Sequence, residues 1–253
     1  MKILILGGTA ESRALAGALA ERPDCTVTLS LAGRTANPLP QGVPTRIGGF
    51  GGAGGLAAYL RDETIDVLID ATHPYAAQIS ANAARASELA GVRLLALRRP
   101  AWQQRQGDQW IDVKSIADAL DTLGVAPRRV FLALGRKEIA PFERAPQHTY
   151  LVRSVDPVDP PLAMPHAIYL TARGPFNEAA DRALLERHRI DVVVAKNSGG
   201  EASYGKIAGA RALHLPVVMV KRPALPEAPS VETVEDVLVW LDHAVTAAAT
   251  RGV

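Results

Sequence analysis

The segment Ile65-Asp66-Val67-Leu68-Ile69-Asp70-Ala71-Thr72 returns about 125 positions later as Ile190-Asp191-Val192-Val193-Val194-Ala195-Lys196-Asn197. Each copy contains a short apolar run, which is the pattern of a strand buried in a parallel sheet. The copies differ most after the strand, where open α/β sheets place their ligands. The sequence therefore predicts two similar halves with different chemistry at the ends of their strands.

The similarity between the halves extends beyond this strand. At nearly the same offset, Gly49-Phe50-Gly51 is matched by Pro175-Phe176-Asn177, and the run 94–100 by 217–223, each ending in two basic residues and a proline. Such spacing suggests a duplicated fold unit, although unrelated parallel βαβ units share the same rhythm. Either origin predicts an α/β protein with two Rossmann-like domains, parallel sheets, and cofactor and substrate in the cleft between the domains.

Strands and helices alternate along both halves. We place the domain boundary after the segment 98–113, which we interpret as irregular, and expect a cofactor-binding domain at 1–113 and a substrate-binding domain at 114–253. The sequence identifies no packing partner for a last helix at 234–249. Strands are expected at 2–6, 26–31, 45–47, 66–70, 92–97, 128–134, 150–152, 167–171, 191–195 and 216–220.

The composition excludes several classes of protein. With 253 residues, 48% of them hydrophobic, the chain has enough apolar surface for a substantial core. A net charge of +2, evenly spread, does not indicate a nucleic-acid partner. The single cysteine, Cys25, excludes an internal disulfide and a multi-cysteine metal site, and we expect no metal. No apolar run is long enough for a signal core or a membrane span, so we expect a cytoplasmic protein without membrane contact.

The turn Gly7-Gly8-Thr9-Ala10-Glu11 follows the first buried strand and precedes a helix. Glycines at this place let the backbone approach a pyrophosphate, which the helix N-terminus stabilises. The full G-x-G-x-x-G pattern is absent, because Ser12 and Arg13 occupy the region of the third glycine. The turn therefore predicts either a nucleotide site formed by Gly7, Gly8, Thr9 and Ser12 or a purely structural turn.

The end of the second strand is where dinucleotide folds discriminate between cofactors. A carboxylate there binds a ribose 2′-hydroxyl, whereas this chain has Ser30, Arg34 and Thr35, which favour the 2′-phosphate of NADPH. An exposed loop arginine is the alternative interpretation. We also expect Gly49, Phe50 and Gly51, in a glycine-rich loop, to approach the cofactor, unless the loop is merely flexible.

The residues after the repeated strand form a second candidate site. In Thr72-His73-Pro74-Tyr75, the Thr72 hydroxyl is expected to touch the cofactor, Pro74 to stiffen the turn, and His73 to donate a proton or a hydrogen bond. A lone histidine is more often structural. The location at the carboxyl end of a central strand favours function.

With these motifs in place, the chain resembles the precorrin-6A reductases of cobalamin biosynthesis, including the cobalt-precorrin-6A reductases of the anaerobic branch. The resemblance spans nearly the whole chain. It implies NADPH-dependent reduction of a macrocycle double bond, with hydride delivered to one ring carbon and a proton to its neighbour, and transient contacts with neighbouring pathway enzymes. It rests on Gly7-Gly8-Thr9-Ala10-Glu11-Ser12, Asp70-Ala71-Thr72-His73-Pro74-Tyr75, Lys196-Asn197-Ser198-Gly199-Gly200 and the segment 215–223.

A tetrapyrrole substrate carries many carboxylates, which need cationic and amide donors from the second half. The loops after its strands supply them, with two glycines that leave amides open to an anion. The proton source stays open among His73, Tyr75, Lys196, Tyr204 and solvent. The candidate substrate contacts are Arg136, Lys137, Arg173, Lys196, Asn197, Ser198, Gly199, Gly200, Ser203, Tyr204 and Lys206.

Two other classes of protein share parts of this pattern. A short-chain dehydrogenase requires a tyrosine with a lysine four residues later, and none of the five tyrosines has one. A non-catalytic NADPH sensor with two domains stays open, as does the choice between a metal-free and a cobalt-containing substrate.

Overall fold

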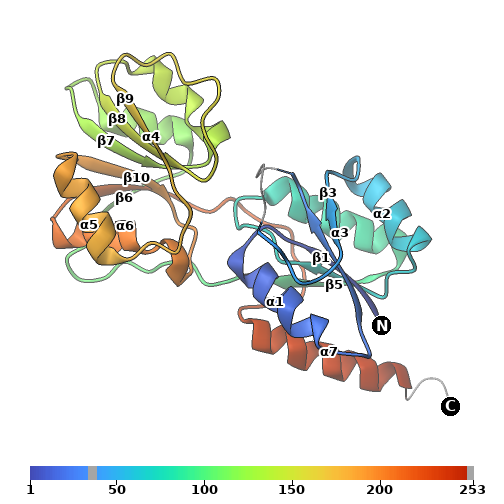
Figure 1. The fold of residues 1–253 in the computed structure, drawn as a ribbon. Helices are drawn as coiled ribbons and strands as arrows, with labels where there is room; N and C mark the ends of the chain where they lie inside the picture. The colour runs from blue at the N-terminus through green and yellow to red at the C-terminus, as the bar shows by residue number, and fades with distance from the viewer. Residues whose placement is uncertain (34–38, 250–253) are drawn as a thin grey trace. The chain divides into compact units, whose positions relative to one another are not determined.

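The computed structural model describes residues 1–33 and 39–249, which form two separate units (Figure 1). One unit consists of Met1–Pro100 together with the segment from Pro223 onward, and the other of Ala101–Arg222. Each unit contains a six-stranded sheet in which all pairs of strands are parallel. The predicted class, an α/β protein with two Rossmann-like domains, is confirmed.

The first unit has the strand order β12-β5-β4-β1-β2-β3. Strand β1 lies in the middle because its apolar run can be buried on both faces. Ile3 and Ile5 pack with α1 and α7, whereas Leu4 and Leu6 pack with α2 and α3, so helices cover both faces of the sheet (Figure 1). The strands are β1 (Lys2–Leu6), β2 (Thr26–Leu31), β3 (Thr45–Ile47), β4 (Val67–Asp70), β5 (Arg93–Leu97) and β12 (Ser230–Val231), and the helices are α1 (Ala10–Ala20), α2 (Gly52–Asp62), α3 (Ala77–Ala90) and α7 (Val234–Ala249).

The second unit has the order β6-β11-β10-β7-β8-β9. Its central strands are arranged across the sheet as in the first unit, with β10, β7 and β8 in the places of β4, β1 and β2. Helices α5 and α6 pack closely because α6 carries glycines on the face toward α5. A Cβ atom on Gly205 would lie 2.7 Å from the backbone of Phe176 and Asn177. The elements are β6 (Gln109–Val113), α4 (Ile116–Leu123), β7 (Arg129–Ala133), η1 (Arg136–Glu138), η2 (Ala140–Arg144), β8 (Thr149–Ser154), β9 (Ala167–Thr171), α5 (Glu178–Arg187), β10 (Val192–Lys196), η3 (Glu201–Ser203), α6 (Gly205–Ala212) and β11 (Pro216–Val220).

In each unit, the sixth strand of the sheet follows directly along the chain after a strand of the other unit. The chain leaves β5 of the first unit and forms β6, which pairs with β11 of the second; it then leaves β11 and forms β12, which pairs with β5 of the first. The expected boundary at residue 113 is therefore wrong, because 101–113 belongs to the second unit and the C-terminal segment to the first. The C-terminal helix α7 packs on the face that also holds α1, through Val237 and Leu241.

The segment 98–113, interpreted as irregular, ends in strand β6. Three of its five residues are exposed, so β6 lacks the apolar run that marks a central strand. Within the described part of the chain, no helix is both long enough and apolar enough to cross a membrane.

Candidate functional site

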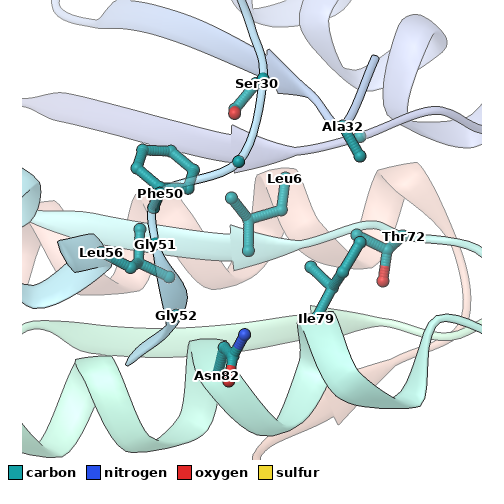
Figure 2. Close-up of a pocket in the computed structure, with 13 residues that line it drawn as sticks. Leu6, Ser30, Ala32, Phe50, Gly51, Gly52, Leu56, Thr72, Ile79 and Asn82 are labelled. Carbon is teal, nitrogen blue, oxygen red and sulfur yellow. The ribbon is translucent and has the colours of Figure 1, made fainter. Parts of the chain in front are cut away.

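A pocket of about 150 Å³ opens at the carboxyl ends of β1 to β4 in the first unit (Figure 2). Figure 2 shows Ile79 and Asn82 pointing from α3 toward Leu6 at the end of β1. Because ligand pockets usually measure about 300–1,000 Å³, this hollow suits one part of a dinucleotide-sized ligand. It is lined by Leu6, Gly7, Ser30, Ala32, Gly48, Gly49, Phe50, Gly51, Gly52, Leu56, Thr72, Ile79 and Asn82.

The pocket combines apolar walls with a few polar groups. Leu6, Leu56 and Ile79 supply the apolar surface, while Ser30 and Asn82 bring a hydroxyl and a carboxamide from different elements. Such a lining is typical of small-molecule and cofactor sites, in which a small number of polar groups fix the orientation of the ligand.

The glycine turn after β1 is held by Ser12, the residue that stands in the region of the missing third glycine. Its Oγ accepts hydrogen bonds from the amides of Gly8 (3.1 Å) and Thr9 (3.0 Å), and Ser12 is 1% exposed. Thr9 caps α1 through its own Oγ1, which accepts from the Ser12 amide. At Gly7, a Cβ atom would lie 2.6 Å from Leu29 Cδ1 and 2.9 Å from Ser12 Oγ, so a larger residue would have to displace these side chains. Ser12 therefore shapes the turn and does not line the pocket.

Arg46 organises the glycine-rich loop after β3. Its guanidinium donates to the carbonyls of Gly48 (2.5 Å) and Gly49 (2.7 Å) and stacks 3.7 Å from the centre of the Phe50 ring. It also reaches Ser30 Oγ at 3.5 Å, since Ser30 and Arg46 are partners in the β2–β3 register. The backbone of this loop thus lines the pocket, and the Arg46 guanidinium is bound to the loop carbonyls.

The loop after β4 is ordered by a buried carboxylate. Asp70, 4% exposed, accepts from the Thr72 amide (3.2 Å) and hydroxyl (2.6 Å), which fixes Thr72 in the pocket wall. His73 Nδ1 accepts from the Tyr75 amide at 3.3 Å, and the two rings lie 5.6 Å apart. When the His73 ring is neutral, this bond places its proton on Nε2.

The structure brings together six of the residues predicted to bind cofactor: Gly7, Ser30, Gly49, Phe50, Gly51 and Thr72 all line the pocket. Gly8, Thr9, Ser12, His73 and Pro74 lie outside its lining. Arg34 and Thr35 fall outside the described residues. Sequence reasoning missed Arg46, Ile79 and Asn82, although the last two stand three residues apart on the helix after β4, a spacing that places them on one face.

In the second unit, the predicted Lys196 lies at the end of β10 and is ion-paired. Its Nζ contacts Glu138 Oε1 at 2.9 Å and Oε2 at 2.7 Å, and the Glu138 carboxylate also accepts from the Gly135 amide at 2.8 Å. Both side chains are partly exposed, at 14% for Lys196 and 30% for Glu138. The ammonium is thus held at the strand end beside the loop after β7.

The other predicted substrate contacts differ in their environment. Lys206 is buried, donates to the Ser203 carbonyl at 2.6 Å and lies 4.8 Å from the centre of the Trp102 ring, which argues against a direct contact with substrate. Arg136 and Arg173 are exposed, and Arg136 donates to the Pro157 carbonyl. Gly199 and Gly200 have left-handed backbone angles. The side chain of Lys137 is outside the described part of the structure.

A buried ion pair lies in the second unit at a strand position that matches Ser30 of the pocket. Arg153 is the fifth of six residues in β8, as Ser30 is in β2. Its guanidinium lies 3.8 Å from the centre of the Phe176 ring and pairs with Asp181 of α5. Arg153 is 8% and Asp181 2% exposed, so both charges of the pair are buried.

Titration and metal ligation give no further candidate. Burial lowers the pKa of His148 and raises the pKa of Tyr150 to about 12, but both side chains lie inside the second unit. Over the ranges that the structure describes, no group of three or more His, Cys, Asp or Glu side chains is placed to hold a metal ion.

Comparison with known proteins finds relatives along the whole chain. The family model described as "Precorrin-6x reductase CbiJ/CobK" matches residues 2–242. A precorrin-6A reductase from Sinorhizobium is 55% identical over 96% of this chain and 93% of its own length. That of Rhodobacter capsulatus is 47% identical over 97% and 98%. A cobalt-precorrin-6A reductase from Salmonella typhimurium is 29% identical over 87% of each. The solved structure of CobK precorrin-6A reductase has a TM-score of 0.92 at 46% identity, covering 96% of both chains.

Proposed function

Because this chain belongs to the precorrin-6x reductase CbiJ/CobK family, we propose that it reduces one macrocycle double bond of precorrin-6A, with NADPH, to give the dihydro product in cobalamin biosynthesis. The observation that carries this proposal is the similarity in sequence and structure over both units, at 46% identity. As a biosynthetic reductase it is expected to work in the cytoplasm and to meet neighbouring pathway enzymes transiently.

The pocket of the first unit fits the adenosine part of the cofactor. Its apolar walls suit an adenine ring, and the glycine turn with the N-terminus of α1 suits a pyrophosphate. Ser30 and Arg46 place a hydroxyl and a guanidinium at the end of β2, where a 2′-phosphate is recognised, and Arg34 and Thr35 are predicted to join them. When bound, the nicotinamide supplies the hydride. The protein itself binds the cofactor and the substrate, orients them and excludes water.

The assignment of the second unit to substrate is supported by two differences from the first unit. A buried ion pair, Arg153–Asp181, stands at the strand position that matches Ser30, and the loop after β7 lacks a Gly-Gly turn. The ends of β7 and β10 instead carry Arg136 and Lys196, cations that suit the carboxylates of a precorrin. His73, Tyr75 and Lys196 stay the candidates for the proton that accompanies hydride transfer.

We favour precorrin-6A, the metal-free compound, over the cobalt form as the substrate. The relatives at 55% and 47% identity are precorrin-6A reductases, whereas the cobalt-precorrin-6A reductase from Salmonella is at 29%. The test is NADPH oxidation by the purified protein with precorrin-6A, run beside the cobalt form and an NADH control. Turnover with precorrin-6A and NADPH supports the proposal. Faster turnover with the cobalt form would assign the protein to the anaerobic branch. NADPH binding without NADPH oxidation in the presence of either substrate would favour a sensor.

A further inference from the structure

Asn82 brings a carboxamide from helix α3 into the pocket of the first unit. It is the sixth residue of α3 and lies with Ile79 on the side of the helix that lines the pocket (Figure 2). Gln78, one turn earlier, donates from Nε2 to Asn82 Oδ1 at 3.1 Å. Figure 2 shows the nitrogen of the Asn82 carboxamide directed away from the helix and toward the pocket. The amide donor thus faces the pocket, and Gln78 holds the carboxamide in this orientation.

The Phe50 ring forms a flat wall of the same pocket. Two side chains outside the pocket lining hold this ring: the Arg46 guanidinium lies 3.7 Å from its centre, and the Tyr59 ring packs edge-on with 5.1 Å between the ring centres. Leu6 and Ile79 add apolar surface. A planar base can stack on such a wall, and the Asn82 carboxamide then meets the edge of the base.

Asn82 lies at the inner end of the pocket, away from the glycine turn. Helix α3 connects the parallel strands β4 and β5, so it runs back from the carboxyl edge of the sheet. At a rise of about 1.5 Å per residue, Asn82 stands roughly 7 Å along the helix axis from the first residue of α3. The pyrophosphate is assigned to the glycine turn, at the carboxyl edge. A purine that enters from there presents to Asn82 the edge opposite its ribose, which carries the ring nitrogen N1.

We propose that Asn82 selects the base of the cofactor by donating from Nδ2 to N1 of adenine, and that Gln78 is a positioning residue that orients this donor. This rests on the proposed function, in which the pocket holds the adenosine part of NADPH. In adenine N1 is an acceptor, whereas in hypoxanthine and guanine N1 carries a proton and is a donor. Two donors that face each other leave both without an acceptor, which lowers affinity for the wrong base.

The test measures the binding of adenosine 2′,5′-bisphosphate and inosine 2′,5′-bisphosphate by calorimetry, because these two ligands differ only in the base. We expect the unsubstituted protein to bind the adenosine compound about 10-fold more tightly or better. Asn82→Asp keeps the shape of the side chain and replaces the donor by an acceptor. It should weaken binding of the adenosine compound about 10- to 100-fold and abolish or reverse the preference. Gln78→Ala should reduce the preference about threefold.

Asn177→Asp is the matched control, since it makes the same chemical change in the second unit. Asn177 caps α5 by accepting from the Ala180 amide at 2.8 Å, and aspartate serves equally well as a cap. This variant should bind both ligands as the unsubstituted protein does. A carboxylate close to the phosphates would weaken both ligands alike, so the ratio of the two dissociation constants isolates the effect on the base.

A preference in Asn82→Asp equal to that of the unsubstituted protein overturns the inference, even if both ligands bind more weakly, and so does the absence of any preference in the unsubstituted protein. If Asn82→Asp does not fold, Asn82→Leu, which is apolar and of similar size, takes its place and should lose the preference without reversing it. Failure of the proposed reaction is distinguishable, because it appears as absent turnover with precorrin-6A, whereas the base preference is measured without tetrapyrrole. If the unsubstituted protein binds neither bisphosphate, both the inference and the assignment of the pocket to the cofactor are wrong.

Discussion

Two adjacent glycines of α2 should respond in opposite ways to the same substitution. In an exposed helix position, Gly→Ala stabilises by about 1 kcal/mol. At Gly54 an added Cβ meets nothing within 4 Å, so Gly54→Ala should show this gain. At Gly55 the added Cβ would lie 1.7 Å from the Phe50 carbonyl oxygen, a backbone atom that cannot rotate away. Overpacking of this kind costs about 1–3 kcal/mol.

We therefore expect Gly55→Ala to be less stable than Gly54→Ala by about 2 kcal/mol, or about 4–8 °C in the thermal midpoint followed by circular dichroism. Relief of the clash must move Phe50, which lines the pocket, so NADPH should bind about 10-fold more weakly to Gly55→Ala, measured by calorimetry. If Gly55→Ala melted at or above Gly54→Ala and bound NADPH equally well, the described packing of the loop against α2 would be wrong.

Four further predictions follow from the contacts of single side chains. Arg46→Ala should weaken NADPH binding about 10- to 100-fold and NADH binding much less, in titrations of both; an equal loss would mean that Arg46 only orders the loop carbonyls. Lys196→Ala should raise KM for precorrin-6A with the NADPH dissociation constant unchanged, and an unchanged KM would remove Lys196 from the substrate site. Asp181→Ala should cost about 3–5 kcal/mol in denaturant unfolding, because it leaves the buried Arg153 charge uncompensated, and a loss below about 1 kcal/mol would contradict this. Burial lowers the pKa of His148 from its ordinary 6.5, so the unfolded chain binds the proton first and the contribution of neutral His148 is lost as pH falls below 6.5; His148→Asn, which cannot titrate, should show a smaller fall in thermal midpoint between pH 7.5 and 5.5.

The sequence was sufficient to predict the central strands, because burial on both faces demands an uninterrupted apolar run. Strands β1, β4 and β10 are such runs. The sequence was not sufficient to predict β6 and β12, the sixth strands of the two sheets. Strand β6 is largely exposed and β12 has two residues, and each pairs with a strand more than a hundred positions away, which no local pattern encodes. The domain boundary was wrong for this reason.

The site was predictable where backbone geometry requires a residue type. The glycines of the turn and of the loop after β3 are of this kind. Arg46 was missed because the direction of its side chain depends on the register of a three-residue strand. The burial of Lys206 was also not predictable, since the sequence does not show that α6 is buried along most of its length and places the lysine against Trp102.

The two units differ at equivalent places far more in side chains than in fold. An arginine stacks on a phenylalanine in both, 3.7 Å from Phe50 in the first and 3.8 Å from Phe176 in the second. In the first unit the arginine comes from the edge strand β3, the small Ser30 lines the pocket, and Gly55 packs its backbone against the Phe50 carbonyl. In the second unit Arg153 itself takes the strand position of Ser30, and Asp181, the fourth residue of α5, takes that of Gly55, the fourth of α2. The same architecture thus carries a serine and a glycine at these two positions in the first unit and a buried ion pair in the second.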